Sequence, residues 1–472
     1  MKFTQEQLDI FAVCKNLNDD QKVSIIAPAG SGKTSTLVEL AKQLPNKTIL
    51  YLAYNQSIKR EAQGKFPSNV TVLTTHGLAL RSQNIKIEEI STSDLSVVDV
   101  QSMFSIEALE AFNAIKIFND FCNSDFRKFN EDIVKRNVSV QAASQIYEKM
   151  KKREIPITHS FYLKEFQFFD KSKINFDLVF LDEAQDSNDV VLNIFLQLKG
   201  SKVFIGDPNQ AIYGFRGSAN AFNKIIADYS MKLTSCFRCV PDVVDKANKV
   251  LEKYKQNPIK MVSKVTPRDD IAFLSQEQIK NYSLKNAIIT RTNSKIVEIL
   301  SLGLDKDMCY ILIKKPQDIF KETINFVRFL NNEKDKIAPE FSYLKEFKSP
   351  AALKQYLEDC GDNNLLSTFN LAKRYGNRIF SIYRKASDDY KNRNKLGRNG
   401  IYLMTAHTSK GLEFDIVTLE KDFPLLSDLA YKKKISFNEL QEEVNLYYVA
   451  ITRAKYLLID KTKNDEEFNK SF

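Results

Sequence analysis

The chain has 472 residues, of which 43% are hydrophobic and 27% are charged, a balance typical of a globular protein with several domains. Its 69 Lys and Arg exceed its 59 Asp and Glu by 10, which favours a polyanionic partner such as nucleic acid without requiring one. The sequence contains neither an apolar run of about 18 residues nor an N-terminal signal core. We therefore expect no membrane association and a cytoplasmic or nucleoid-associated protein.

The cysteines give no sign of a disulfide framework. The six are scattered along the chain, which suits a reducing compartment. Cys236 and Cys239 form a C-x-x-C pair, but neither a second pair nor a nearby His completes a zinc site. We therefore expect no structural zinc.

In the first half of the chain, short β-rich apolar runs alternate with helical patterns. The predicted strands are 23–26, 48–53, 70–73, 178–181 and 202–205. Between the third and fourth of these, residues 85–169 are rich in Phe, Lys and Asn at helical spacing, as in 106–112. This long interruption predicts a helical insertion.

The second half repeats the pattern. Its predicted strands are 287–290, 401–404, 416–419 and 456–459, and the charged stretch 332–398 is helical in spacing. Apolar strands interleaved with helices are typical of parallel sheets that are covered on both faces. The sequence therefore predicts an α/β fold of two parallel-sheet lobes, each carrying a mainly helical insertion.

A phosphate-binding loop is predicted at residues 27–34, Ala-Pro-Ala-Gly-Ser-Gly-Lys-Thr, between a predicted strand and a predicted helix. The glycines let backbone N–H groups close around phosphate oxygens, and the helix N-terminus adds a favourable dipole. Lys33 would bind the β and γ phosphates, and Thr34 would offer its hydroxyl to Mg²⁺. Ala27 stands where the usual pattern has its first Gly, so a chance Gly-rich turn is the alternative.

An acidic pair, Asp182 and Glu183, directly follows the predicted strand 178–181. Asp182 would hold Mg²⁺ through water, and Glu183 would orient and deprotonate the attacking water. The alternative is an acidic cap at the end of a strand. Together with the phosphate-binding loop, the pair predicts nucleoside triphosphate hydrolysis.

Further motifs narrow the class of nucleotide hydrolase. They are residues 206–217, 405–414 and 449–454, each beside or after a predicted strand. In this order they resemble the motif series of superfamily-one helicases of the UvrD/Rep/PcrA type, and the resemblance extends from Gln7 to Arg453. Residues 66–70, Thr75-His76 and 412–415 are most similar to the helicase core of F-box DNA helicases. The resemblance implies two RecA-like lobes with the ATP site between them.

The resemblance also implies a division of the chain into six parts. We expect lobe 1A at 1–84 and 170–231, its helical insertion 1B at 85–169, lobe 2A at 232–331 and 399–472, and a reduced insertion 2B at 332–398.

Roles for individual residues at the ATP site follow from the resemblance. Gln7 is similar to the residue that reads the adenine edge, with an ordinary polar helix residue as the alternative. Gln210 matches the sensor of the γ-phosphate. Phe237 would stack on adenine, Arg238 would contact the γ-phosphate, and Arg453 resembles an arginine finger.

The resemblance gives the whole expected ATP site. The catalytic residues are Lys33, Asp182, Glu183, Gln210, Arg238 and Arg453, and the metal-binding residues are Thr34 and Asp182. The ATP-binding residues are Gln7, Ala29, Gly30, Ser31, Gly32, Lys33, Thr34, Ser35, Phe237, Arg238, Gly411 and Glu413. Glu413 matches a ribose contact, whereas Ser35 stands where family members often carry Arg.

The resemblance also implies a track that binds single-stranded DNA. It combines contacts to the DNA backbone with aromatic side chains on which bases stack. Its expected members are Tyr54, Asn55, Thr75, His76, Tyr213, Phe215, Arg216, Thr405 and His407. Phe215 takes a position where the family usually has Trp, a residue that this chain lacks entirely. For a lone aromatic residue, core packing is the alternative.

The expected function is ATP- and Mg²⁺-dependent movement, 3′ to 5′, along single-stranded DNA or a tailed duplex, in repair, recombination or replication restart. We expect a monomer or weak oligomer and leave a protein partner open. A second hypothesis is a DNA-stimulated motor or sensor subunit of a larger complex, for protein stripping or phage defence, with little unwinding of its own. A nucleotide hydrolase unrelated to DNA is disfavoured by the Tyr213, Phe215 and Arg216 cluster, while RNA is not distinguished from DNA.

Overall fold

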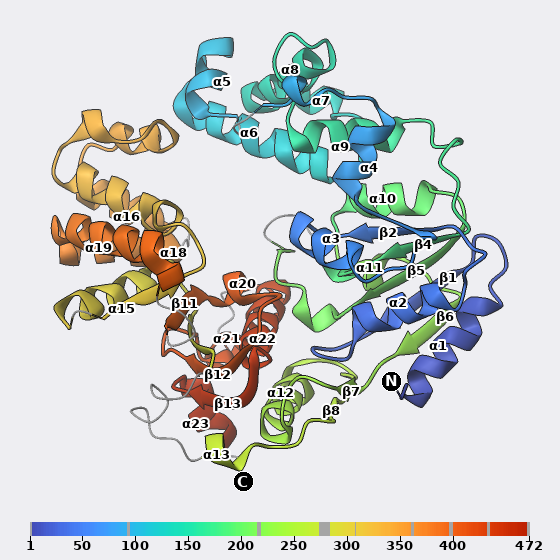
Figure 1. Ribbon diagram of the computed structural model, residues 1–472. Helices are drawn as coiled ribbons and strands as arrows, with labels where there is room; N and C mark the ends of the chain where they lie inside the picture. The colour runs from blue at the N-terminus through green and yellow to red at the C-terminus, as the bar shows by residue number, and fades with distance from the viewer. Residues whose placement is uncertain are drawn as a thin grey trace. The chain divides into compact units, whose positions relative to one another are not determined.

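The structure is a computed structural model that describes residues 2–91, 95–214, 219–272, 284–306, 308–359, 363–395, 400–431 and 435–469 (Figure 1). The chain separates into two compact units, Met1–Phe237 (unit 1) and Arg238–Phe472 (unit 2). Among the described residues, no helix is long and apolar enough to cross a membrane.

Unit 1 contains a six-stranded sheet in the order β3-β2-β4-β5-β1-β6, and all of its paired strands are parallel. The strands are β1 (Lys22–Ile26), β2 (Ile49–Ala53), β3 (Val70–Thr74), β4 (Leu178–Leu181), β5 (Ser201–Gly206) and β6 (Tyr229–Lys232). Because parallel strands end at the same edge, the loops after β1, β2, β3, β4 and β5 share one side of the sheet. That edge carries the predicted phosphate-binding loop and the acidic pair.

The two faces of this sheet contribute to two different cores. Alternate side chains of a strand point to opposite faces, so Val203 and Ile205 of β5 join one core while Phe204 joins the other. The first core includes α1 (Gln5–Lys15) and α2 (Lys33–Lys42). The second is shared with the predicted insertion. The remaining helices of this sheet layer are α3 (Gln56–Gln63), α4 (Thr75–Ser82), η2 (Ala184–Asp186), α10 (Asp189–Gln197), η3 (Pro208–Gln210) and α11 (Ala221–Lys224).

The first predicted insertion is helical, as expected. It contains η1 (Ile87–Glu89), α5 (Val97–Phe104), α6 (Ala108–Asn123), α7 (Glu131–Val134), α8 (Val138–Lys151) and α9 (His159–Phe168). Its buried residues, such as Phe118 and Phe161, belong to the same core as Leu50, Leu52 and Leu181 of the sheet. The insertion therefore shares a continuous core with the sheet layer, and its helices α6 and α9 pack against α10, with α9 also against α4.

Unit 2 contains a five-stranded sheet in the order β10-β11-β9-β12-β13, again with all pairs parallel. The strands are β9 (Asn286–Thr290), β10 (Tyr310–Leu312), β11 (Ile401–Thr405), β12 (Phe414–Leu419) and β13 (Ala454–Asp460). Two further short strands are β7 (Ser235–Cys236), which belongs to unit 1, and β8 (Val262–Ser263). The unit-2 sheet supplies a second platform of the kind that the sequence predicted.

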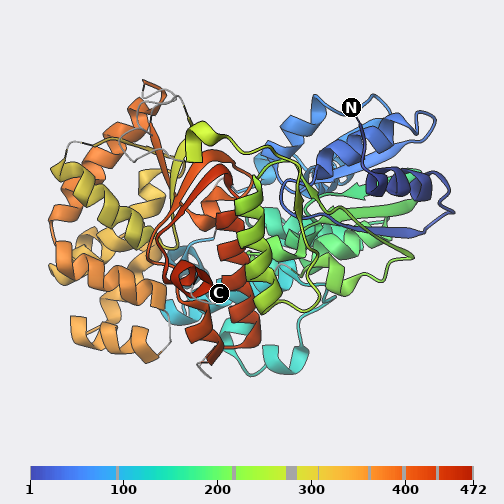
Figure 2. The ribbon, with the colours of Figure 1, turned by 90° about the horizontal axis from the view of Figure 1, so that it is seen from below.

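The helices of unit 2 fall into two groups. Around the sheet lie α12 (Pro241–Tyr254), α13 (Asp269–Ala272), α20 (Ala406–Ser409), α21 (Leu426–Tyr431), α22 (Phe437–Ile451) and α23 (Lys463–Asn469), with α12 and α22 side by side (Figure 2). The second group contains α15 (Asn293–Asp305), α16 (Pro316–Leu330), η5 (Lys334–Lys336), η6 (Pro339–Glu346), α17 (Pro350–Asp359), α18 (Asn363–Tyr375), α19 (Arg378–Asn392) and η7 (Arg393–Lys395). Its α-helices and η6 share one core. The predicted second insertion thus packs against helices that precede it.

The predicted α/β class with two parallel sheets and helical insertions is confirmed. Every predicted strand is present, but β6, β10 and the two-residue strands β7 and β8 were not predicted. Strand β6, Tyr-Ser-Met-Lys, is a largely exposed edge strand without an apolar run, and β10 has three residues. Such strands leave little periodicity to detect. The six-part division of the chain stays a prediction.

Candidate functional site

The loop between β1 and α2 has the backbone of a phosphate cradle. Gly30 and Gly32 adopt positive φ angles of 71° and 82°, which residues with a Cβ rarely reach. Ala27 is tied to the neighbouring strand, because its N–H donates to the carbonyl oxygen of Gly206 at 2.8 Å. The loop is therefore fixed at its strand end while its glycines curve the backbone.

One side chain of this loop is poised for a ligand. Ser31 is buried, and its Oγ has no hydrogen-bond partner among the described residues. Leaving a buried hydroxyl unpaired costs about 1–3 kcal/mol, which a bound phosphate oxygen would recover. The residues present therefore fit a nucleotide phosphate. Thr34 is partly buried and Ser35 is exposed on the first turn of α2.

The acidic pair lies beside the loop, as Lys33 Nζ is 3.6 Å from Glu183 Oε1. Asp182 is buried and accepts hydrogen bonds from the Tyr51 hydroxyl at 2.5 Å and from the Glu183 N–H at 2.8 Å. Burial, followed by the negative charge of Glu183, raises the pKa of Asp182 to about 6. A cation at Asp182 would offset both effects, so the donor set also fits Mg²⁺.

Gln185 joins the acidic pair to the next strand, and the sequence did not single it out. Its Nε2 donates to Glu183 Oε2 at 2.6 Å, and its Oε1 accepts from the N–H of Asp207 at 3.1 Å. Asp207 in turn accepts from Gln210 Nε2 at 2.8 Å. A chain of hydrogen bonds thus connects the proposed base Glu183 with the proposed sensor Gln210. Gly206 makes room for it, since a Cβ there would lie 2.1 Å from Gln185 Oε1.

Gln7 takes part in capping the N-terminus of α1. Its Oε1 accepts from the N–H of Thr4 and its backbone N–H donates to Thr4 Oγ1, which together form a capping box at α1. Its Nε2 donates to Thr36 Oγ1 at 2.9 Å. This amide therefore links α1 to α2, next to the phosphate-binding loop, and its contact with adenine stays a prediction. Phe237, whose backbone N–H donates to the carbonyl oxygen of Gly30 at 2.8 Å, has a side chain that is half-exposed.

In unit 2, three charged residues form a half-exposed cluster. Arg238 Nε donates to Glu413 Oε2 at 2.9 Å, and Lys455 Nζ lies 2.7 Å from Glu413 Oε1. Although burial tends to raise the pKa of Glu413, the hydrogen bond from Lys455 and the charge of Arg238 lower it overall. Lys455 was not predicted. Gly411, two residues before Glu413, has a positive φ of 82° that shapes the turn before β12.

Arg453 lies inside unit 2. It is 1% exposed, and its Nε donates to the carbonyl oxygen of Val449 at 2.9 Å. One terminal nitrogen donates to the carbonyl oxygen of Leu412 at 3.1 Å and the other to Thr452 Oγ1 at 3.2 Å. In this arrangement the guanidinium holds the segment before Glu413 against α22.

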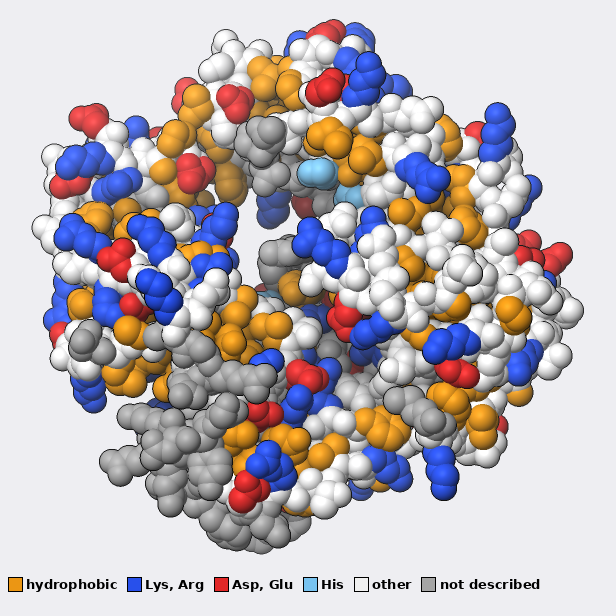
Figure 3. Space-filling view, viewed as in Figure 1, with side chains coloured by type: hydrophobic (Ala, Val, Ile, Leu, Met, Phe, Trp, Pro, Cys, Tyr) orange, Lys and Arg blue, Asp and Glu red, His pale blue; other side chains and the backbone are white. Residues whose placement is uncertain are grey.

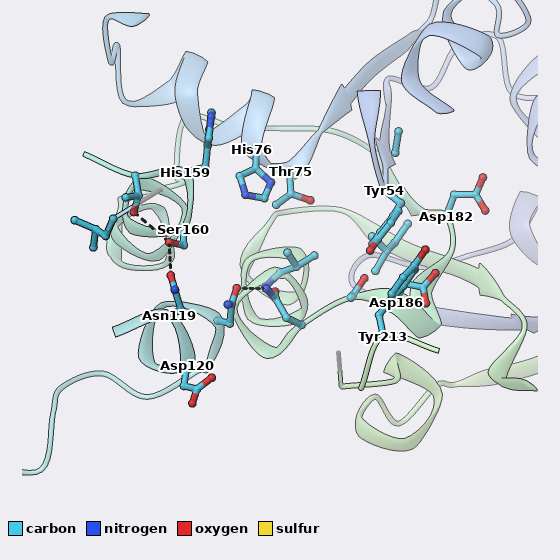
Figure 4. A pocket seen from close by; sticks show the side chains of 18 of the residues that line it. Tyr54, Thr75, His76, Asn119, Asp120, His159, Ser160, Asp182, Asp186 and Tyr213 are labelled. Atoms are coloured by element: carbon cyan, nitrogen blue, oxygen red, sulfur yellow. Dashed lines mark hydrogen bonds between the residues drawn. The ribbon is translucent and has the colours of Figure 1, made fainter. Parts of the chain in front are cut away.

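A cavity of about 780 Å³ in unit 1 gathers four of the predicted strand-binding residues. Tyr54, Thr75, His76 and Tyr213 all line it, and Figure 4 shows the two tyrosine rings together on one wall. Their centroids are 6.1 Å apart at an interplanar angle of 11°. Asp182 also lines this cavity, which places the acidic pair next to the aromatic wall.

The opposite wall of the cavity comes from the insertion and was not predicted. His76 meets the rings of His159 and Tyr162 edge to face, at 6.4 and 6.0 Å between centroids. The Nδ1 atom of His159 is 3.0 Å from the Tyr162 hydroxyl oxygen. Burial, followed by the charge of His159, lowers the pKa of His76 to about 4, so His76 is neutral at pH 7. Helical spacing made the α9 residues look like ordinary core positions.

The remaining residues that were predicted to contact DNA do not line this cavity. Asn55 caps α3 through its Oδ1, which accepts from the N–H of Ile58 at 2.9 Å. Thr405 caps α20, and His407 lies within that helix in unit 2. Phe215 and Arg216 lie outside the described residues. Lys and Arg side chains are spread over the face shown in Figure 3 and form no single basic patch there.

Comparison with known proteins gives concordant matches. A family model described as the UvrD-like helicase C-terminal domain matches residues 79–463. F-box DNA helicase protein 1 of Schizosaccharomyces pombe is 29% identical over 94% of this chain and 56% of its own length. F-box DNA helicase 1 of Gallus gallus is 26% identical over 97% of this chain and 49% of its own length. The chain therefore spans about half the length of these relatives, and the resemblance inferred from the motifs is confirmed.

Proposed function

Because the chain belongs to the family with a UvrD-like helicase C-terminal domain, we propose that it is an ATP-dependent translocase or helicase acting on single-stranded DNA. The observation that carries this proposal is the position of Asp182. It belongs to the acidic pair beside the phosphate-binding loop, and it also lines the cavity with Tyr54 and Tyr213. A change at the nucleotide therefore has a short path to a bound base.

At the nucleotide, the loop residues bind and orient the phosphates. Lys33 and the Ser31 hydroxyl would contact phosphate oxygens, while Thr34 and Asp182 would hold Mg²⁺, which would neutralise charge on the phosphates. Glu183 accepts a proton from the attacking water. Because Gln185 donates to Glu183 and bonds the Asp207 backbone, it keeps this carboxylate directed toward Lys33.

We propose nucleotide-binding roles for unit 2 as well. Glu413 binds the ribose, and Arg238 binds the γ-phosphate. For Arg453 to act as an arginine finger, it must exchange its bonds to the Val449 and Leu412 carbonyl oxygens for a phosphate. Until it does, it serves as a positioning residue for the segment that carries Glu413.

At the proposed DNA-binding cavity, stacking of bases on Tyr54 and Tyr213 supplies about 1–3 kcal/mol of affinity per base, and this affinity does not depend on the DNA sequence. Thr75 and His76 complete that part of the cavity wall. The proposed direction of movement is 3′ to 5′, and the proposed setting is DNA repair, recombination or replication restart.

The experiment that tests the proposal is steady-state ATP hydrolysis with and without single-stranded DNA, followed by strand displacement on duplexes with a 3′ or a 5′ tail. We expect DNA to stimulate hydrolysis and the 3′-tailed duplex to be unwound. Hydrolysis that single-stranded DNA does not stimulate would refute the proposal. Unwinding from the 5′ tail alone would refute the direction.

A second candidate function is a DNA-stimulated motor subunit with little unwinding of its own. The observation that favours it is the modest second insertion, in which α17, α18 and α19 are the α-helices described between residues 332 and 398. Stimulated hydrolysis without displacement from either tail would select this candidate.

A further inference from the structure

Strand β2 carries one polar side chain in an otherwise apolar run. Its sequence is Ile-Leu-Tyr-Leu-Ala, residues 49–53, and all five residues are buried. Tyr51 is 0% exposed, and its ring packs against Phe66 with 4.7 Å between the centroids. A Phe at this position would fill the same space, and a hydroxyl is costly to bury unless it is hydrogen-bonded. The hydroxyl therefore needs an explanation other than packing.

The hydroxyl of Tyr51 is directed at Asp182, the predicted metal ligand of the acidic pair. It donates to Asp182 Oδ2 at 2.5 Å, and the backbone N–H of Asp182 donates to the carbonyl oxygen of Leu52 at 3.2 Å. A phenol keeps its proton at neutral pH, so it acts as a donor to a carboxylate. Asp182 is thus bound to β2 through its main chain and through its side chain.

Two hydrogen bonds fix the orientation of the Asp182 carboxylate. The last side-chain torsion of an Asp is broad, so an unbound carboxylate takes many orientations. Here Oδ1 accepts from the N–H of Glu183 at 2.8 Å, while Oδ2 accepts from Tyr51. Each oxygen has two lone pairs, which leaves acceptor capacity on both for a further ligand. Because the Glu183 donor is a backbone group, the hydroxyl of Tyr51 is the orienting donor that belongs to a side chain.

We propose that Tyr51 is a positioning residue for Mg²⁺ at the nucleotide site, because its hydroxyl holds the Asp182 carboxylate in the orientation that binds the hydrated metal. The inference rests on the nucleotide-binding part of the proposed function and deepens it. Tyr51 is fully buried, so it acts through Asp182 and not by touching the nucleotide. Hydrogen-bond partners of this kind orient metal ligands, and their loss weakens metal binding about 10–100-fold.

The test separates the contribution of Mg²⁺ from the binding of the nucleotide itself. Fluorescence titration measures the dissociation constant of mant-AMPPNP, a non-hydrolysable ATP analogue, for the full chain in Mg²⁺ and in EDTA. The constant in EDTA divided by the constant in Mg²⁺ is the metal-dependent affinity ratio. In Tyr51→Phe we expect this ratio to fall about ten-fold, because Asp182 loses its fixed orientation. The constant in EDTA should stay within about two-fold of wild type, since the phosphate-binding loop is unchanged.

Tyr447→Phe is the matched control. Tyr447 is 1% exposed, and its hydroxyl donates to Asp460 Oδ2 in unit 2, so this variant also removes a buried bond from a phenol to a carboxylate. Asp460 is not a predicted metal ligand. We therefore expect Tyr447→Phe to keep the wild-type affinity ratio. Thermal unfolding of both variants records the stability that each one loses.

A double-variant cycle tests whether Tyr51 acts through Asp182. Asp182→Asn should lower the metal-dependent affinity ratio by itself, because it removes the negative charge that attracts the cation. Adding Tyr51→Phe to Asp182→Asn should then change the ratio by less than about two-fold, since residues that act as one unit are not additive. Losses that multiply in the double variant would overturn the proposal.

Phe66→Leu carries the test if Tyr51→Phe does not fold. It loosens the packing of the Tyr51 ring and leaves the hydroxyl in place. A less well-held donor should lower the metal-dependent affinity ratio by about three-fold, a smaller loss than removal of the hydroxyl. An unchanged ratio in Phe66→Leu would then overturn the proposal.

The outcomes distinguish the inference from the proposed function. A wild-type ratio in Tyr51→Phe, or equal weakening in Mg²⁺ and in EDTA, would overturn the role of Tyr51 and leave the proposed function standing. A wild-type chain whose affinity does not depend on Mg²⁺ would also overturn the inference. Failure of the wild-type chain to bind mant-AMPPNP would overturn the inference and the proposed function together. Binding without any stimulation of hydrolysis by single-stranded DNA would refute the proposed function alone.

Discussion

The two units hold their candidate nucleotide-binding groups in opposite ways. In unit 1, Asp182 is buried, and Tyr51, Gln185 and Lys33 surround the acidic pair with hydrogen bonds and charge. In unit 2, Glu413 is half-exposed between Arg238 and Lys455. The first arrangement is a fixed network, and the second is a set of ion pairs that water can reach.

This difference indicates how each unit can respond to a nucleotide. Exposed ion pairs contribute about 0–1 kcal/mol, so the bonds between Arg238, Glu413 and Lys455 can be exchanged for bonds to a ligand at small cost. A buried polar group left unpaired costs more, about 1–3 kcal/mol. We therefore expect the unit-1 groups to be preorganised for catalysis and the unit-2 groups to rearrange.

The largest effect on ATP hydrolysis should follow from removing the positive charge of Lys33 or the proposed base Glu183 in unit 1. Lys33→Ala and Glu183→Gln should each lower the rate of ATP hydrolysis about a hundred-fold or more, because each removes a group that acts on the phosphates or the water. Steady-state hydrolysis in the presence of single-stranded DNA measures this. The matched control is Lys42→Ala, which lies in the last turn of α2, the helix that begins at Lys33. DNA-stimulated hydrolysis retained in Glu183→Gln would refute its role as the base.

A smaller loss should follow from disturbing the network without removing a catalytic group. In Gly206→Ala the new Cβ would displace Gln185, which holds Glu183, and we expect hydrolysis to fall about ten-fold in a folded protein. Gly64→Ala is the control, since its Cβ would meet no atom within 4 Å. Unchanged hydrolysis in Gly206→Ala would show that Gln185 does not position the base.

A still smaller effect on the use of ATP is expected from a substitution in unit 2. Glu413→Gln removes two half-exposed ion pairs, so the unfolding temperature should stay nearly constant while KM for ATP rises about three-fold through loss of the proposed ribose contact. Thermal unfolding and ATP titration measure the two quantities. A large fall in unfolding temperature would show that this cluster is structural, like the network of unit 1.

The smallest effect concerns a buried cation in the insertion. Lys164 donates to the Ser124 carbonyl oxygen at 2.9 Å, and burial lowers its pKa to about 8. Above pH 8 the folded chain releases this proton while the unfolded chain keeps it up to its ordinary value, so this residue's contribution to stability rises with pH. Relative to Lys164→Met, the wild-type unfolding temperature should therefore rise by about one or two degrees between pH 7.5 and 9.5, because a modest free-energy change shifts the melting of a unit of this size only slightly.

Lys128→Met, an exposed position in the same insertion, is the control for that comparison and should show no such dependence. If the difference in unfolding temperature between wild type and Lys164→Met stayed constant from pH 7.5 to 9.5, it would contradict the lowered pKa of Lys164.

The sequence predicted those parts of the site whose geometry is local. The phosphate-binding loop and the acidic pair each follow one strand, so strand periodicity and a few adjacent residues locate them. Gln185 was missed because its partner Asp207 lies just after another strand, β5, 22 residues later in the chain. His159 was missed because residues of an amphipathic helix look alike until its neighbours are known. The capping box of Gln7 with Thr4 was visible in the sequence and was not used.

The order of strands in unit 1 also bears on how the protein is made. Strand β1, which carries the phosphate-binding loop, pairs with β5 and β6, whose residues follow it by about 180 to 200 positions. At synthesis rates of about 5–20 residues per second, those partners emerge roughly ten seconds or more after β1. During that interval the nascent loop has no sheet to anchor it. Completion of the nucleotide site therefore waits on the late strands, and a truncated product ending before β5 would expose the apolar β1 to chaperones.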